Sequence, residues 1–166
     1  MEAAIQHQRI LDLVAREPGL HLRELPRRLD LSLNAVRYHL YSLLGDGLVV
    51  EHRIGRFVRY FRPSTPREER ALISAVRVPG ERLVLHRLLS SPAGFAALQR
   101  STSLPPGTLS HYLTLLIREA IVDQDAATRL YRLHDTAAVR SRLAQYRERF
   151  PDLLAAAAEE MFDLTG

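Results

Sequence analysis

The chain has 166 residues, a formal net charge of +4 and a sequence pI of about 9.9. That length holds one ordinary domain or two small ones, and a hydrophobic content of 46% is enough for a core and excludes wholesale disorder. The absence of cysteine excludes a disulfide framework, a Cys-based zinc site and a thiol redox sensor.

The distribution of apolar residues indicates the compartment in which the protein is expected. Met1 to Arg16 alternates charged and apolar residues and lacks the unbroken apolar run of a signal peptide. No stretch approaches the ~20 apolar residues that a membrane-spanning helix needs. We therefore expect a cytoplasmic, nucleoid-associated protein with no membrane partner.

The first predicted unit begins with three helices. A helix over residues 2–16 ends at Pro18-Gly19, a short helix follows near 22–29, and a third spans about 33–45 with Ser32 as its N-cap. The apolar residues expected to bury the first and third helices are Ile10, Leu11 and Val14, and Val36, Leu40, Leu43 and Leu44.

A β-hairpin is expected after the third helix. Residues 48–50 and 57–61 are strand-like and are joined around Gly55. Three helices followed by a hairpin are the order of a winged helix-turn-helix domain, which we predict over residues 1–63.

The rest of the chain repeats this plan. Leu109 stands 73 residues after Val36 and Val84 stands 74 after Ile10, and the apolar positions around these pairs coincide, so the chain is predicted to be a duplicated unit. The expected fold is mainly α with small β-hairpin wings: two tandem winged helix-turn-helix domains plus C-terminal helices. A linker over 64–79 is expected to hold a helix near 66–77, broken by Pro79-Gly80. A second, degenerate domain is expected over 80–135, with helices near 81–90, 95–101 and 106–118 and strands near 121–124 and 129–133. Two further helices, 136–150 and 151–164, are expected in a possible dimerisation region over 136–166.

The exposed side of the third helix contains the first candidate DNA contacts. With the apolar stripe inward, Asn34, Tyr38 and Tyr41 point outward and Arg37 flanks them. Asn pairs with adenine and Arg with guanine, whereas a tyrosine hydroxyl reaches phosphate. Asn34 could instead help to cap its helix. Ser32, at the start of the helix, completes this candidate set, whereas His39, at the edge of the buried face, is predicted to be a packing residue.

The first hairpin supplies a second set of candidates. All 23 positively charged residues of the chain are arginine, and four of them, with a single acid, lie between Glu51 and Arg62. Arg53, Arg56 and Arg59 are predicted to contact phosphate or the minor groove, each adding to affinity and to its salt dependence. A GC-rich genome would also favour arginine, and a solvated edge strand would explain the charge without DNA.

The second unit has few of these features. Ser110, His111 and Thr114 on its third helix and Arg129 in its hairpin are weak candidates. Two aspartates precede two arginines in that hairpin, so its local charge is zero. This unit is expected to bind DNA weakly or to pair with the first unit or a second chain.

Five stretches carry a resemblance to a known family: Pro18 to Leu25, Val36 to Leu40, Gly47 to Val49, Gly55-Arg56 and Arg59 to Phe61. Through them the chain resembles ArsR/MarR-like winged-helix regulators, and as a whole it looks like archaeal-type predicted regulators with two tandem winged-helix domains. The resemblance implies dimeric or pseudo-dimeric DNA binding through the third helix and wing. It covers roughly residues 5–135, and this sequence departs from metal-sensing members because it has no cysteine pair and no close cluster of histidines and acids, so no metal is expected.

These patterns predict a sequence-specific regulator of transcription that binds double-stranded DNA as a homodimer or an intrachain pseudo-dimer, without a cofactor and with no effector identified. An enzyme is not expected, because the chain lacks a Gly-rich phosphate loop and a nucleophile elbow. Two alternatives stay open: a tandem winged-helix module for protein–protein assembly, and an abundant chromosomal protein that coats DNA without sequence preference.

Overall fold

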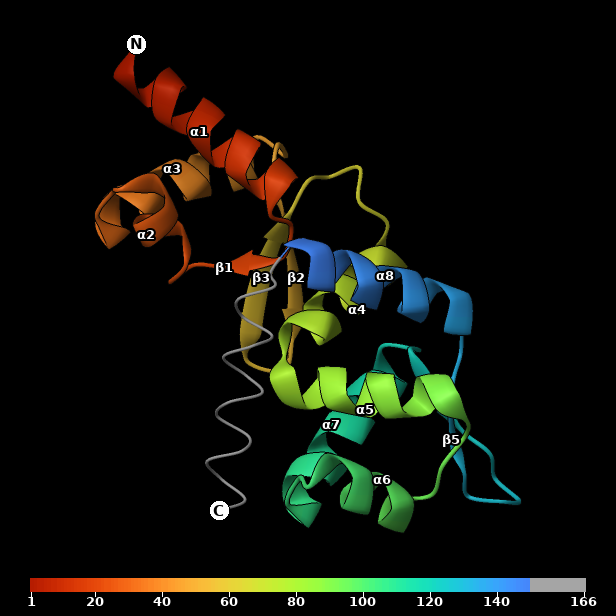
Figure 1. Cartoon of the computed structure of the whole chain (residues 1–166). Coiled ribbons are helices and arrows are strands. Elements are labelled where there is room, and N and C mark those ends of the chain that lie inside the picture. The colour runs from red at the N-terminus through yellow and green to blue at the C-terminus, as the bar shows by residue number, and fades with distance from the viewer. Residues whose placement is uncertain (150–166) are drawn as a thin grey trace. The chain divides into compact units, whose positions relative to one another are not determined.

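The computed structural model describes residues 1–149 (Figure 1). Contacts divide the chain into two compact units, one over Met1–Ser74 and the other from Ala75 onward. The described part is mainly helical and has two small antiparallel sheets, which confirms the predicted fold class. The helix predicted over 151–164 lies outside the described residues.

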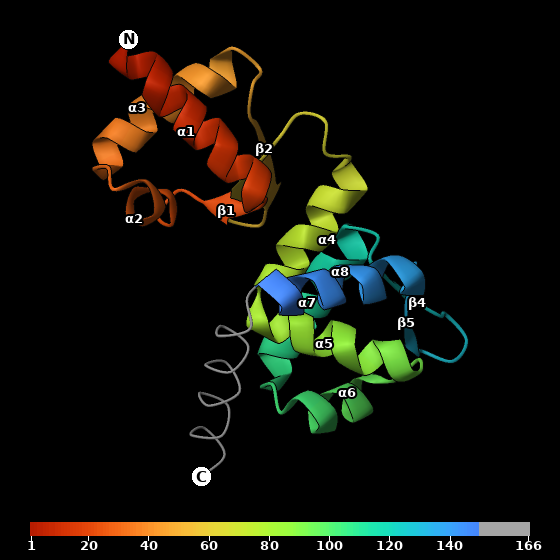
Figure 2. The ribbon, with the colours of Figure 1, turned by 45° about the horizontal axis from the view of Figure 1, so that its top comes forward.

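The first unit has three helices and a three-stranded sheet. Ile10, Leu25 and Val36, one from each helix, are completely buried in the common core. Figure 2 shows the three helices grouped together, with the sheet at the C-terminal end of the first. The elements are α1 (Glu2–Arg16), β1 (Leu20–His21), α2 (Leu25–Leu29), α3 (Leu33–Gly45), β2 (Val50–Ile54) and β3 (Phe57–Phe61), followed by α4 (Arg67–Arg77).

Helices α1 and α3 have the predicted bounds, whereas α2 starts three residues later than expected. Pro26 is the second residue of α2, where a missing N–H costs nothing. Before it, the His21 N–H donates to Glu24 Oε2 over 2.9 Å, which holds the preceding turn. Asp30 ends α2 in the left-handed conformation, with φ of 53°.

The sheet has the strand order β1-β3-β2, and its two-residue strand β1 was not predicted. Leu20 pairs with Tyr60 of β3, which joins the end of α1 to the hairpin. Strand β2 begins at Val50, two residues after the predicted start, because the N–H groups of Leu48 and Val49 donate to Leu43 O at the end of α3. At the tip, Gly55 has φ of +58° and opens a two-residue loop, as type II′ hairpins require.

The second unit follows the same element order. Helix α5 starts at Pro79, not near 81, since proline suits a first helical turn, so Pro79-Gly80 begins a helix. A bridge between Ala93 and Tyr131 takes the place of β1, and both strands of the hairpin are shorter than predicted. The elements are α5 (Pro79–Ser90), α6 (Phe95–Thr102), α7 (Pro106–Arg118), β4 (Val122–Gln124), β5 (Tyr131–Leu133) and α8 (Thr136–Arg149).

Helices α5 and α7 of the second unit approach closely at Gly80. A Cβ atom at this position would lie 2.2 Å from Cε2 of Tyr112, so the absence of a side chain permits the contact. Arg82, also buried, donates to Val76 O over 2.7 Å and lies 4.7 Å from the ring centroid of Tyr146 on α8. The start of α5 is therefore fixed by backbone packing and by one buried guanidinium.

Candidate nucleic-acid interface

Helix α3 presents a long polar and aromatic face. Ser32 caps it, with its Oγ accepting from the Ala35 N–H over 3.2 Å, and 13 residues give a rod about 20 Å long. Val36, Leu40 and Leu43 are buried, as predicted. The residues predicted to face outward, Asn34, Arg37, Tyr38 and Tyr41, are exposed, as is Ser32.

The two tyrosines of α3 are unusually open for aromatic side chains. Tyr38 is 71% exposed and Tyr41 72%. Both lie on the same helix face as Asn34 and Arg37, so the face combines amide, guanidinium and phenol groups. Two large aromatic side chains exposed together on one polar face are consistent with a binding surface.

His39 packs at the edge of this face. Its ring makes edge-to-face contacts with His7 of α1 and with Tyr38, both at centroid distances of 5.2 Å. The packing role matches the prediction. Its Nδ1, however, is buried without a hydrogen-bond partner in the described structure.

The tip of the wing exposes cations and an aromatic ring. Arg53, at the end of β2, pairs with Val58 across the hairpin, and Arg56 lies in the turn. The Arg56 guanidinium lies 5.8 Å from the centroid of the Phe57 ring, which is 54% exposed. The Arg56 guanidinium and an exposed apolar ring thus lie together at the end of the wing.

The buried position of Arg59 disagrees with its prediction as a DNA contact. Its side chain is 9% exposed, and its Nη1 donates to Gly19 O over 2.8 Å. The carbonyl of Gly19 belongs to the turn between α1 and β1. Arg59 therefore ties β3 to that turn, and its guanidinium is not presented to a duplex.

Helix α3 and the sheet form one continuous surface. Arg37 and Tyr41 of α3 and Glu51 and Tyr60 of the sheet line a small hollow of about 40 Å³, together with Leu22, Leu40 and Leu44. Burial raises the pKa of the Tyr60 phenol, with further contributions in the same direction from Glu51 and Tyr41. The nearby cations Arg53 and Arg37 oppose that shift in the pKa. Arg37 of α3 and Arg53 of the wing thus lie close enough to influence the same phenol.

Sequence reasoning missed three parts of this region. In the sequence Glu51 is only the single acid of the wing, but in the structure it lines the same hollow as Arg37. Arg23, just before α2, and Arg27, within it, are exposed cations. Their signal in the sequence is that both are charged residues outside the apolar stripe of Leu22, Leu25 and Leu29.

The corresponding residues of the second unit form a different surface. Ser110, His111 and Thr114 are exposed on α7, but the Thr114 hydroxyl donates to Ser110 O over 2.9 Å. Arg129 is exposed in the loop between β4 and β5, with φ of 60°. These candidates present short polar groups and a single cation.

The hairpin of the second unit holds as many carboxylates as guanidinium groups. Asp125 accepts hydrogen bonds from the backbone and hydroxyl of Thr128, which lower its pKa and keep it ionised. Asp123 lies 3.1 Å from Nδ1 of His134, and Arg132 lies 4.0 Å from Asp125. This hairpin therefore has no net positive charge with which to attract phosphate.

In residues 1–149 no three His, Cys, Asp or Glu side chains are grouped so that they could hold a metal ion. Over the same residues, no helix combines the length and the apolar character needed to cross a bilayer.

Comparison with known proteins agrees with the geometry of the first unit. Residues 5–73 match a family model described as an N-terminal HTH domain. No curated protein matches the chain. The matched range contains α2, α3 and the three-stranded sheet. The first unit is therefore a helix-turn-helix domain, a class of domain that binds DNA.

Proposed function

We propose that this protein is a sequence-specific regulator of transcription that grips duplex DNA with α3 and the wing of its first unit. The observation that supports it most is the shared surface of these two elements. Arg37 and Tyr41 of α3 line the same hollow as Glu51 and Tyr60 of the sheet. A groove-sized helix and a cationic finger on one surface suit a duplex, which is contacted in the groove and along its backbone at once.

Within this interface, α3 occupies the major groove. Asn34 and Arg37 recognise base edges, because amide and guanidinium groups bond bidentately to adenine and guanine. Ser32, Tyr38 and Tyr41 bind backbone phosphates and fix the register of the helix.

The wing binds along the duplex backbone or in the minor groove. Arg53 and Arg56 make this contact, and Phe57 adds an apolar surface beside Arg56. Arg59 supports the wing from behind through its bond to Gly19 O. Each phosphate contact releases counterions, so binding depends on salt.

The second unit, in this proposal, is a degenerate winged helix-turn-helix domain with an assembly role. Its repeated element order supports the tandem arrangement, and its ionised Asp125 disfavours a phosphate contact. The proposed organisation is a first domain over 1–63, a linker over 64–79, a second domain over 80–135 and C-terminal helices over 136–166. The protein acts as a homodimer or an intrachain pseudo-dimer of the ArsR/MarR-like kind, without enzymatic activity or a cofactor.

Selection from randomised duplexes at physiological salt tests base recognition. We expect the natural protein to enrich a defined site, and Asn34→Ala or Arg37→Ala to relax preference at particular base pairs by about 1–3 kcal/mol each. Arg118→Ala, an exposed arginine on α7, is the matched control and leaves the selected site unchanged.

Three results of this selection would overturn the proposal in different ways. Tight binding without an enriched site would indicate a general DNA-coating protein. Absence of binding even at low salt, where phosphate attraction is strongest, would favour a protein–protein assembly module. An enriched site that neither α3 variant alters would remove base recognition from α3.

A further inference from the structure

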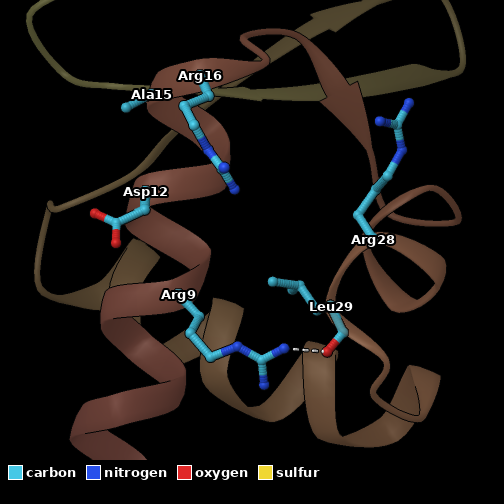
Figure 3. A pocket seen from close by; sticks show the side chains of 6 residues that line it. All are labelled: Arg9, Asp12, Ala15, Arg16, Arg28 and Leu29. Atoms are coloured by element: carbon cyan, nitrogen blue, oxygen red, sulfur yellow. Dashed lines mark hydrogen bonds between the residues drawn. The ribbon is translucent and has the colours of Figure 1, made fainter.

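A hollow between α1 and α2 of the first unit lies among residues that the proposed DNA interface does not use. Its volume is about 440 Å³, within the roughly 300–1,000 Å³ usual for small-molecule sites. Figure 3 shows its lining, in which Arg9 and Arg16 extend from α1 into the space between the two helices. The lining residues are Arg9, Asp12, Ala15, Arg16, Arg28 and Leu29.

The charge of this hollow is positive. Three guanidinium groups line it against one carboxylate, that of Asp12, whose Oδ1 accepts from Gln8 Nε2 over 2.8 Å. Glu17, just outside the lining, forms an ion pair of 2.7 Å with Arg28. Even with Glu17 counted, positive charges outnumber negative ones by three to two. Arginine side chains bind carboxylates and phosphates in a planar, bidentate manner.

A hydrogen bond links the hollow to the segment just before α3, the helix proposed to enter the major groove. Arg9 Nη2 donates to Leu29 O, the last carbonyl of α2, over 2.5 Å, and Arg9 Nη1 donates to Gln6 over 2.9 Å. After Leu29 comes the left-handed Asp30, and then Ser32, which caps α3. The Arg9 guanidinium therefore contributes one of the hydrogen bonds at the α2–α3 turn, together with the bond from the Leu31 N–H to Pro26 O.

We infer that this hollow binds a small anionic effector with carboxylate or phosphate groups, and that occupancy alters DNA binding by α3. Ala15, Leu29 and the aliphatic parts of the arginines accept an apolar portion of such a molecule. An anion that draws the Arg9 guanidinium away from Leu29 O changes the turn before α3. The coupling free energy equals the difference between the effector's binding free energies to the free and to the DNA-bound protein. The regulatory part of the inference rests on the proposed function, whereas the binding site does not.

Calorimetry without DNA tests the site itself. The full chain is titrated with inorganic phosphate or with citrate, in sodium chloride adjusted to constant ionic strength. We expect saturable binding of at least one probe, and Arg16→Met to weaken it by about tenfold or more, the loss of a charge-assisted hydrogen bond. Arg100→Met, which removes an exposed arginine of α6 in the second unit, is the matched control and retains full affinity.

A second variant changes the affinity in the opposite direction and guards against misfolding of the first. Asp12→Asn removes the one carboxylate of the lining and is expected to tighten binding several-fold. A response to phosphate alone, or to citrate alone, identifies the preferred group. No saturable binding of either probe, or equal binding by the natural protein and both hollow variants, would overturn the site.

DNA affinity with and without the probe, at constant ionic strength, tests the coupling. We expect the probe that binds to change the affinity of the natural protein for DNA and to leave that of Arg16→Met unchanged. A probe that binds in calorimetry but leaves DNA affinity unchanged would overturn the regulatory part. Probe binding by a protein that ignores all duplexes would contradict the proposed function while supporting the site.

Discussion

Arginine residues in this protein have different roles according to where the fold places them. Arg56 lies exposed in the wing turn, whereas Arg59, three residues later, is buried and bonded to Gly19 O. A spacing of three cannot keep residues on one face of a strand, because side chains alternate with a period of two. The sequence shows a series of cations in the wing, but it does not show which of them are turned inward.

Replacement of Arg59 separates these roles. Arg59→Met should lower the free energy of unfolding by about 1–3 kcal/mol, because a buried carbonyl loses its charged donor. Arg56→Met, with the same change in charge and volume, should stay within about 0.5 kcal/mol. Urea denaturation of the full chain measures both, and equal effects of the two variants would contradict a structural role for Arg59.

At the scale of elements, local signals located the longer helices. Ser32 caps α3 as predicted, and α1 and α3 have the expected bounds, because capping and a 3.6-residue period are properties of the segment itself. Strand β1 has only two residues and no period to detect. It forms because Leu20 pairs with Tyr60, a residue forty positions later in the chain.

The wing turn offers a test of backbone conformation alone. A Cβ added at Gly55 or at Gly45 would meet no atom within 4 Å, so neither substitution creates a clash. Gly55 has φ of +58°, so Gly55→Ala should destabilise the protein by about 1–2 kcal/mol. Gly45 is the last residue of α3, and Gly45→Ala should stabilise by up to about 1 kcal/mol.

Thermal and urea unfolding of both variants decide this prediction. Because the two changes add the same methyl group in open space, steric clash does not contribute to their difference. That difference combines the φ penalty at Gly55 with the gain in helix propensity at Gly45. Unchanged or increased stability of Gly55→Ala would show that the left-handed conformation at the wing turn carries no cost.

At the scale of the whole molecule, two units with one element order differ in charge. The first wing exposes Arg53 and Arg56, whereas the second hairpin holds Asp123 and an Asp125 whose pKa is lowered by its bonds to Thr128. The two units share an element order, so their cores meet similar packing requirements. Their surfaces are not tied by that requirement, and the second hairpin has no net positive charge.

The salt dependence of DNA binding should therefore differ between the hairpins. Replacing Arg53 and Arg56 with alanine should weaken binding to all duplexes and reduce the slope of log affinity against log salt by about one to two units. The double replacement of Arg129 and Arg132, matched in charge, should leave the slope unchanged. Fluorescence anisotropy over a salt series measures both, and a reversed order would place the second unit at the duplex.

The sequence by itself determined the helices of both units, the hairpins, the apolar stripes and the outward face of α3. These features depend on spacing within short segments, and the candidates Asn34, Arg37, Tyr38 and Tyr41 followed from that spacing. Only the tertiary structure decided that Arg59 is buried, that Glu51 shares a hollow with Arg37, and that Arg9 reaches the end of α2. Each of these facts joins segments distant in the chain, and such pairings are set by how the elements pack.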